Sequence, residues 1–275
     1  MTDQQTRAAR FRSLHTSADP IVLANTWDPA SARIVAATGA KAVATTSAGV
    51  AWTLGVPDGD VLSRDAALEH LARIVAAVPA GLPVTADIES GFGATPAEVA
   101  VTIRGVLAAG AVGVNLEDTV RAGGARLRDI PGQAERIAAA RAAADDAGVD
   151  LYINARVDTY LRGGGTVEAT AERAAAFLAA GATGIFVPGV ADAATIAALT
   201  AAIPAPLNVL AEPETPSVAE LAKLGVARVS LGSWVAEAAY AVVRRAAEEA
   251  QSKGTYGALA GSIDFGELNG MMSNG

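Results

Sequence analysis

Short runs rich in β-branched residues alternate with longer, alanine-rich amphipathic segments along the 275-residue chain. Strands that alternate with helices in this way pair in parallel and are joined by right-handed crossovers. The expected strands are Ile21–Trp27, Ala42–Thr46, Pro83–Ile88, Gly113–Glu117, Leu151–Val157, Gly184–Val187, Leu207–Ala211 and Arg228–Leu231. Eight such units favour closure into a single-domain (β/α)8 barrel of the TIM type.

The segments between these runs carry the helical pattern, and several of them end in a glycine just before the next strand. A glycine there provides the left-handed conformation that stops a helix. The expected helices are Ser31–Ala37, Ala66–Ala77, Pro96–Ala108, Gln133–Ala147, Val167–Ala179, Ala193–Ala201, Val218–Leu224 and Val235–Gln251. Residues 254–275 lie outside the eight units, and we expect a tail or an oligomer-contact segment there. The alternative fold is an open doubly wound sheet, but the segment after the first strand lacks its glycine-rich phosphate fingerprint.

Composition restricts the partners and the chemistry. The net charge of −8 leaves no basic stripe for a nucleic acid. The chain has no cysteine, which excludes disulfides, thiolate metal sites and a cysteine nucleophile. The polar amino terminus and the lack of an apolar run of about 20 residues predict a cytoplasmic protein with no membrane partner.

The active site of such a barrel lies at the carboxyl ends of its strands, and polar residues follow most of the expected strands. Three pairs of these residues are two positions apart: Asp87 and Glu89, Asn115 and Glu117, Asn154 and Arg156. This spacing points both side chains of a pair in the same direction from a strand.

Asp87, Glu89 and Glu117 are therefore expected to converge. Three carboxylates repel one another unless a hard cation is bound, so this arrangement predicts a Mg2+ site, with Mn2+ as the alternative ion. Arg156 on the next strand offers a rigid fork for a substrate carboxylate or phosphonate. The alternative is a buried ion-pair network with a structural role only.

Two long segments between expected elements stand out. Ala48–Arg64 carries Asp58, and Thr119–Pro131 contains two adjacent glycines and three arginines directly after the Glu117 strand. A glycine-containing loop beside a site predicts a lid that excludes water. An ordinary solvated connection is the alternative. The two histidines, His15 and His70, lie away from the strand ends, so we expect no acid–base role for either.

Motifs that run in order through most of the chain resemble the isocitrate lyase/phosphoenolpyruvate mutase superfamily. The matching segments are NTWDPASAR, TSAGVAWTLGVPD, ADIESGFG, VNLEDTV, INARVDTY and LGSW. The resemblance implies a (β/α)8 barrel that assembles as dimers or tetramers and exchanges its terminal helix between subunits. It also implies a Mg2+-dependent reaction on a small α-oxycarboxylate through an enolate-like species.

The resemblance also implies roles for individual residues. Asp87 corresponds to the metal ligand of the family's D-x-D-x-G motif, and Glu89 stands where the family commonly has a second Asp. Glu117 corresponds to the Glu that holds the metal directly or through water.

The substrate-binding positions follow from the same motifs. Arg156 corresponds to the substrate-binding Arg, and Asn208 to a position that contacts substrate in some members. Thr46 and Ser47 fall where a Ser-Gly pair contacts the substrate oxyacid. Asp58 corresponds to an Asp at the mouth of the site.

The lid departs from the family pattern. Lyases that act on isocitrate or methylisocitrate carry Lys-Lys-Cys-Gly-His there, and phosphonopyruvate-forming mutases carry a Lys and an Asn. This chain has Gly and Arg instead. Loss of a positioned general acid costs about 10^2–10^4 in rate, so neither standard substrate is supported.

The sequence therefore predicts a Mg2+-dependent C–C lyase or hydrolase that acts on a small α-keto or α-hydroxy carboxylate. Arg156 would hold the carboxylate, and Asp58 or the lid residue Arg126 would assist proton movement. One alternative is a mutase or hydrolase that acts on the P–C bond of a phosphonopyruvate-like substrate. Another is a non-catalytic barrel that binds a metabolite. A homo-oligomer, either a dimer or a tetramer, is expected in each case.

Overall fold

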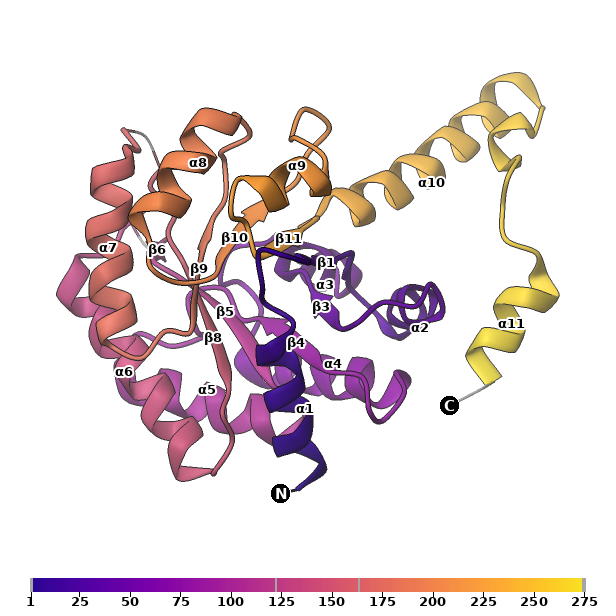
Figure 1. The fold of residues 1–275 in the computed structure, drawn as a ribbon. Coiled ribbons are helices and arrows are strands. Elements are labelled where there is room, and N and C mark those ends of the chain that lie inside the picture. The colour runs from indigo at the N-terminus through magenta and orange to yellow at the C-terminus, as the bar shows by residue number, and fades with distance from the viewer. Residues whose placement is uncertain (1, 122, 163, 274–275) are drawn as a thin grey trace.

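The computed structural model describes residues 2–121, 123–162 and 164–273. Its main sheet has the strand order β1-β11-β10-β9-β8-β5-β4-β3-β2, and all of these strands pair in parallel (Figure 1). The strands are β1 (Ile21–Leu23), β2 (Asn25–Thr26), β3 (Val43–Thr45), β4 (Val84–Asp87), β5 (Gly113–Glu117), β8 (Tyr152–Arg156), β9 (Gly184–Val187), β10 (Leu207–Leu210) and β11 (Arg228–Ser230).

The first expected strand is divided at Ala24. Its first half, β1, pairs with β11, and its second half, β2, pairs with β3. The two ends of the sheet are thus consecutive in the chain, so the sheet closes into a ring. The predicted TIM-type barrel is confirmed, and the ninth strand arises only from this division.

Helices surround the ring in the order that the sequence predicts (Figure 1). They are α2 (Pro29–Ala37), α4 (Arg64–Ala77), α5 (Pro96–Ala108), α6 (Ile130–Asp146), α7 (Val167–Ala179), α8 (Ala193–Ala202), α9 (Val218–Lys223) and α10 (Trp234–Lys253). Local signals explain where several of them begin. The Thr95 side chain accepts a hydrogen bond from the Glu98 backbone N–H, and the Glu98 carboxylate accepts one from the Thr95 backbone N–H, which is a capping box.

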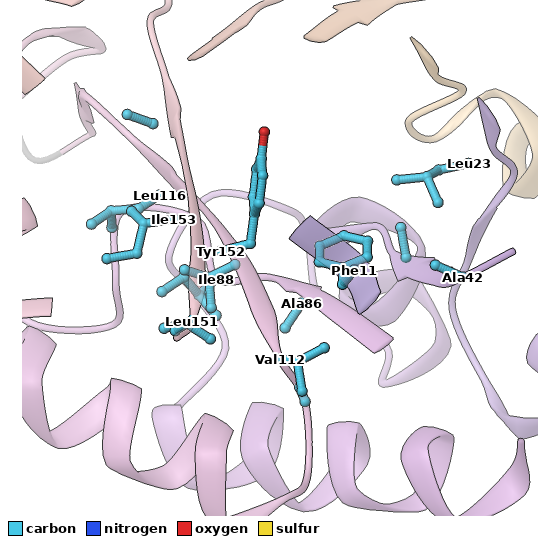
Figure 2. Close-up of a cluster of buried hydrophobic side chains, with 14 of the residues drawn as sticks. Phe11, Leu23, Ala42, Ala86, Ile88, Val112, Leu116, Leu151, Tyr152 and Ile153 are labelled. Atoms are coloured by element: carbon cyan, nitrogen blue, oxygen red, sulfur yellow. The ribbon is translucent and has the colours of Figure 1, made fainter. Parts of the chain in front are cut away.

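An amino-terminal helix, α1 (Asp3–Ser13), closes the amino end of the barrel, although the sequence pattern did not predict it. Gln4 donates hydrogen bonds to the carbonyl oxygens of Leu107 and Ala111, in the turn that leads into β5. Phe11 is completely buried, and its ring lies edge-on to Tyr152 at 5.5 Å between centroids. Figure 2 shows both rings among small aliphatic side chains of the core.

Both segments that were expected to be loops contain regular structure. Ala48–Arg64 overlaps a short helix, α3 (Ser47–Thr53), and Thr119–Pro131 contains an antiparallel hairpin of β6 (Thr119–Val120) and β7 (Arg126–Leu127). The expectation of irregular loops is therefore wrong for these parts. The hairpin carries residues of the segment predicted to form a lid; Ala122 of this segment lies outside the described residues.

The carboxyl-terminal segment leaves the barrel. Helix α10 has Ala236 as its one buried residue, and Figure 1 shows it projecting from the barrel. After η1 (Gly257–Leu259), helix α11 (Phe265–Ser273) returns beside α2, where Arg33 donates hydrogen bonds to the carbonyl oxygens of Met271 and Met272. Over the described residues, no helix combines the length and apolarity needed to cross a membrane.

His15 follows α1 and is buried, with its ring stacked on Tyr152 at 3.8 Å. Its Nδ1–H donates to the Phe11 carbonyl oxygen at 2.8 Å, because a carbonyl oxygen can only accept. Burial, reinforced by the charge of Arg228, lowers the pKa of His15 from 6.5 to about 3. The folded protein therefore keeps this ring neutral at a pH where the unfolded chain protonates it.

We expect the pKa of His15 to make folding sensitive to acid. Below pH 6.5 the unfolded state binds the additional proton, so the free energy of unfolding falls as the pH falls. Between pH 6 and pH 4, protonation of His15 in the unfolded state lowers the free energy of unfolding by about 2–3 kcal/mol. Urea denaturation of the wild type and His15→Phe at both pH values measures it: the pH-dependent loss should be smaller in the variant by this amount. Equal losses in the two proteins would contradict the assignment.

Candidate active site

A polar cavity of about 160 Å3 lies at the carboxyl ends of the strands, where the fold predicts the site. Its polar lining comes from both halves of the barrel: Asn25, Thr46, Ser47, Asp58, Asp87, Asn115, Arg156, Ser230 and Ser233. Five of the predicted site residues, Thr46, Ser47, Asp58, Asp87 and Arg156, are therefore brought together around one space.

Asp87 ends β4 and is held by its neighbours. Its backbone N–H donates to the Thr45 hydroxyl at 2.9 Å, and the Ser47 backbone N–H is 3.5 Å from one of its carboxylate oxygens. Burial raises the pKa of Asp87; Arg156 opposes this effect, and the nearby charge of Asp58 adds to it. A carboxylate in this environment is stabilised by an additional positive charge.

Glu89 is placed differently from the prediction. Strand β4 ends at Asp87, and Glu89 has a left-handed backbone with φ of 51°. Strand alternation no longer applies there, and Glu89 does not line the cavity. Its carboxylate accepts hydrogen bonds from the backbone N–H groups of Gly59, at 3.0 Å, and Asp60. Burial raises the pKa of Glu89 to about 7. In this arrangement Glu89 anchors the loop that carries Asp58.

Glu117 lies within β5 and is almost completely buried between two arginines. One carboxylate oxygen is 3.2 Å from Arg156 Nη1, and the other is 3.1 Å from Arg121 Nη2. Burial raises the pKa of Glu117 to about 8, although Arg156 opposes the shift. This part of the site is an ion-pair network, which was the alternative to a cluster of three metal ligands.

Arg156 is oriented by two carboxylates. Besides the Glu117 contact, its Nε donates to Asp158 at 2.6 Å, and its guanidinium lies 5.7 Å from the centre of the Phe186 ring. Burial alone would lower the pKa of Arg156, but the carboxylates of Glu117 and Asp158 raise it. The guanidinium is thus permanently charged and fixed at the wall of the cavity.

Asp58 lies at the mouth of the cavity, as predicted. Its Oδ2 is 3.8 Å from Arg121 Nη2. Its other oxygen, Oδ1, is buried and has no hydrogen-bond partner among the residues that the structure describes. A buried carboxylate oxygen without a donor favours a water or a cation at this position.

Asn208 lies on β10, in register with Phe186, which lines the cavity. It is buried and does not itself line the cavity; its side-chain oxygen accepts a hydrogen bond from Ser230, which does. Its contact with substrate stays a prediction. The lid residue Arg126 lies on β7, and it too is absent from the cavity lining formed by the described residues.

Sequence reasoning gave no role to several residues that shape the site, including Asn25 and Ser233 of the lining. Asp158 orients Arg156, Arg121 links Glu117 with Asp58, and Asn115 and Ser230 form part of the lining. Asn115 and Asp158 were visible as polar residues at strand ends. Arg121 and Ser230 had no such signal, because their roles depend on contacts between distant segments.

The two histidines lie outside the cavity. His70 is on α4, where its Nε2 is 2.7 Å from the carbonyl oxygen of Trp27. His15 lies at the opposite end of the barrel, against α1.

The residues at this site fit a Mg2+ ion held by one or two carboxylates. They do not form the predicted cluster of three carboxylate ligands. Across residues 2–121, 123–162 and 164–273, no group of three Asp, Glu or His side chains is placed to hold an ion. Mg2+ retains several waters in most protein sites and is bound through one or two carboxylates. Asp87 provides one such carboxylate, and Asp58, whose Oδ1 has no partner among the described residues, lines the same cavity.

Comparison with known proteins agrees with the motifs. The family model of phosphoenolpyruvate phosphomutase matches residues 11–251. The chain belongs to this family. The predicted membership of the isocitrate lyase/phosphoenolpyruvate mutase superfamily is therefore confirmed. This superfamily contains C–C lyases and phosphonomutases that act on small carboxylates.

Three similar proteins illustrate the range of the family. An uncharacterised protein of Mycobacterium tuberculosis is 38% identical over 224 residues, which are 81% of this chain and 81% of that protein. Oxaloacetate decarboxylase of Pseudomonas aeruginosa is 31% identical over 268 residues, 95% of this chain and 89% of the relative. A solved structure from Burkholderia cenocepacia, described as a phosphonomutase, is 46% identical with a TM-score of 0.85 and covers 90% of this chain and 99% of its own.

Gly49 in α3 supports the segment that carries Thr46 and Ser47. A Cβ at this glycine would lie 2.7 Å from the Trp27 Cβ and 2.8 Å from the Thr46 Cγ2. We expect Gly49→Ala to destabilise the protein by about 1–3 kcal/mol, because this overlap outweighs the better helix propensity of alanine. The matched control is Gly270→Ala, since a Cβ at that helical glycine meets nothing within 4 Å. Thermal unfolding of both variants checks this, and an unchanged Tm for Gly49→Ala would contradict it.

Proposed function

We propose that this protein is a Mg2+-dependent enzyme that cleaves a C–C bond of a small α-keto or α-hydroxy dicarboxylate, as a lyase or a hydrolase. The observation that carries the proposal is Arg156, a guanidinium held by Glu117 and Asp158 at the wall of a small cavity that also contains Asp87. A guanidinium that is fixed in place, with the Asp87 carboxylate in the same cavity, suits recognition of an α-oxycarboxylate.

Arg156 binds the substrate carboxylate in this proposal. Its Nη1 and Nε are engaged by Glu117 and Asp158, which restrict rotation of the guanidinium before a ligand arrives. A fork that is already oriented loses less entropy on binding than a mobile one. Thr46 and Ser47 contact the same oxyacid group from the opposite wall.

Asp87 is the proposed direct metal ligand, with Asp58 and Glu117 acting through water. A bound Mg2+ would supply Lewis-acid stabilisation for negative charge that develops on the substrate oxygen. Asp58 is also the group that moves a proton, because its unpaired Oδ1 is the free carboxylate oxygen at the mouth of the cavity. Glu89 contributes by holding the Gly59–Asp60 backbone, which positions Asp58.

The β6–β7 hairpin acts as the lid. Arg121, at the start of this segment, reaches across to Glu117 and Asp58, so it ties the hairpin to the mouth of the site. Closure over a bound substrate would exclude water from the reacting carbon.

The size of the cavity favours a small substrate. About 160 Å3 is below the range of about 300–1,000 Å3 that is usual for drug-sized ligands. A C3 to C5 acid suits this space better than a tricarboxylate such as isocitrate. The lack of cysteine argues in the same direction, because the lid cannot supply the thiol acid of the isocitrate-type lyases.

The second candidate is phosphonate chemistry at the same site. The similarity to the Burkholderia protein described as a phosphonomutase favours it. Arg156 could hold a phosphonopyruvate-like substrate equally well, whereas the lid lacks the Lys and Asn of phosphonopyruvate-forming mutases. A barrel that binds a metabolite without turnover is the third candidate.

Combined 1H and 31P NMR with Mg2+, and with EDTA as a control, separates the three candidates. The panel contains oxaloacetate, 2-alkylmalates, isocitrate, methylisocitrate, phosphonopyruvate and phosphoenolpyruvate. We expect EDTA-sensitive loss of a small dicarboxylate with the appearance of a new carboxylate or keto-acid product. A changed phosphorus resonance would instead establish the second candidate, and binding of a panel member without any change in signals would favour the third.

Two substitutions test the residue roles on whichever substrate turns over. Asp87→Asn should lower kcat/KM by about a hundredfold or more, because it removes the charge that holds the metal. Arg156→Lys should raise KM by about tenfold, since a point charge cannot form the two parallel hydrogen bonds of the fork. Asp65→Asn on the exposed first turn of α4 is the control. Wild-type kinetics in either site variant would contradict the assigned role.

We also propose that the protein is a homo-oligomer, held by the segment that leaves the barrel. Val243, Tyr256 and Phe265 are 64%, 70% and 83% exposed, which places large apolar groups in water along α10 and the tail. Exposed apolar surface of this kind is typical of a subunit interface.

Light scattering after size-exclusion chromatography should give a mass that is a multiple of the 27.5 kDa chain. Val243→Glu combined with Phe265→Ser should lower this mass, because the charge and the polar group disfavour burial of the segment. Val101→Ser, at an exposed apolar position on α5 outside this segment, is the control and should leave the mass unchanged. A monomeric wild type would contradict the proposal.

A further inference from the structure

Beneath the cavity, on the inner face of the barrel, lies an arginine that is completely buried. Arg228 begins β11, and its relative exposure is 0%. Over the part of the chain that the structure describes, no carboxylate lies within ion-pair distance of it. Burial lowers the pKa of Arg228 to about 10, so the guanidinium is still charged at neutral pH.

This buried charge has neutral partners. Nη2 donates to the Asn115 side-chain oxygen at 3.2 Å, and Nε is 3.4 Å from the Ser230 hydroxyl. Nη1 is buried and has no acceptor within the described residues. A buried cation without a counter-ion is costly for folding, whereas an apolar side chain of similar volume is not. A buried cation whose presence is costly for folding indicates a role other than stability.

The contact with Asn115 fixes which end of that amide faces the cavity. Arginine is a donor only, so the atom of Asn115 that it contacts must be the oxygen. Asn154 Nδ2 donates to the same oxygen at 2.9 Å from the neighbouring strand. Both donors lie on the inner side, and Asn115 itself lines the cavity. Its oxygen is occupied by these two donors, so its NH2 group is the end that is available to a ligand in the cavity.

We propose that Asn115 is a substrate-binding residue whose NH2 group donates to an anionic oxygen of the ligand, and that Arg228 is the positioning residue that holds it in this orientation. The register pairs Asn115 with Asp87 on one side and with Asn154 on the other. The donor therefore lies beside the carboxylate proposed to hold the metal. Arg228 also places a positive charge below a site that must accept an anion. The inference rests on the proposed function only in taking the ligand to be a small carboxylate.

The test uses the full-length protein and oxalate, a dianion that resembles the enolate of a small α-keto acid. The 15N-labelled asparagine side chains are followed by NMR during an oxalate titration, with and without Mg2+. We expect the Asn115 NH2 resonance to shift in the wild-type protein, and its assignment comes from its loss in Asn115→Asp. A wild-type Asn115 resonance that does not respond to oxalate overturns the proposal.

Arg228→Met removes the charge and keeps an unbranched side chain. We expect its thermal stability to match or exceed that of the wild type, while oxalate affinity falls about tenfold and the Asn115 shift is lost. A purely structural arginine would give the opposite pattern, lower stability with unchanged oxalate binding, and that result overturns the proposal.

Asn115→Asp provides a second test that does not depend on Arg228→Met folding. The carboxylate accepts the hydrogen bonds from Arg228 and Asn154 as before, so the protein should remain folded, but it turns a donor into an acceptor on the cavity side. Oxalate affinity should fall by more than tenfold. Asn115→Ala is the matched control, since it removes the NH2 donor at the same position without adding a charge, and its oxalate affinity should also fall.

Unchanged oxalate affinity in Asn115→Ala would show that the added charge alone causes the loss in Asn115→Asp, and would overturn the directed-donor proposal. Oxalate binding requires no turnover. A protein that binds oxalate through Asn115 but transforms no substrate would therefore refute the proposed reaction and leave this inference intact.

Discussion

The ring of parallel strands closes at Ala24, where the first strand changes partners from β11 to β3. The side chain of Asn25 links the two partners. Its Nδ2 donates to the Thr45 carbonyl oxygen, and its oxygen accepts hydrogen bonds from the backbone N–H groups of Leu231 and Gly232. These contacts join residues about 200 positions apart in the chain. Because the ring is closed, the carboxyl ends of all its strands surround one space.

The second constraint is the number of charges that this closure buries. Glu117 and Asp158 are almost fully buried, and each is matched by Arg156, while Asp118 is matched by Arg173 at 3.1 Å. Such pairs hold side-chain directions firmly, because removal of either partner would leave an isolated buried charge. Asp87 and Arg228 are exceptions. Asp87 is partly buried and Arg228 completely buried, and neither has an ion-pair partner among the described residues; Asp87 lines the cavity, and Arg228 contacts Asn115 beneath it. The site is thus electrostatically incomplete without its ligands.

Much of the architecture follows from local patterns, and the failures have identifiable causes. The eight strands and the surrounding helices could be predicted because each buries a periodic apolar set and ends in a glycine or a cap. Helix α1 was missed because its sequence is mostly polar and only Ala8 and Phe11 are buried; contacts with the barrel stabilise it. Glu89 was misplaced because strand β4 ends two residues earlier than the two-residue spacing assumed. Contact of Asn208 with substrate could not be settled from the sequence, because strand position alone does not fix depth in a tilted barrel.

The sequence by itself determined the alternation of strands and helices, the lack of thiol chemistry and the presence of Asp87, Glu117 and Arg156 at strand ends. These are properties of local order and composition, which are readable along the chain. Only the tertiary structure decided that Glu117 is paired with Arg156 and Arg121, that Glu89 anchors a loop, and that Arg228 lies beneath Asn115. The physical reason is that a side chain's role depends on its partners across the barrel, and those partners are set by register, strand ends and burial rather than by distance in the sequence.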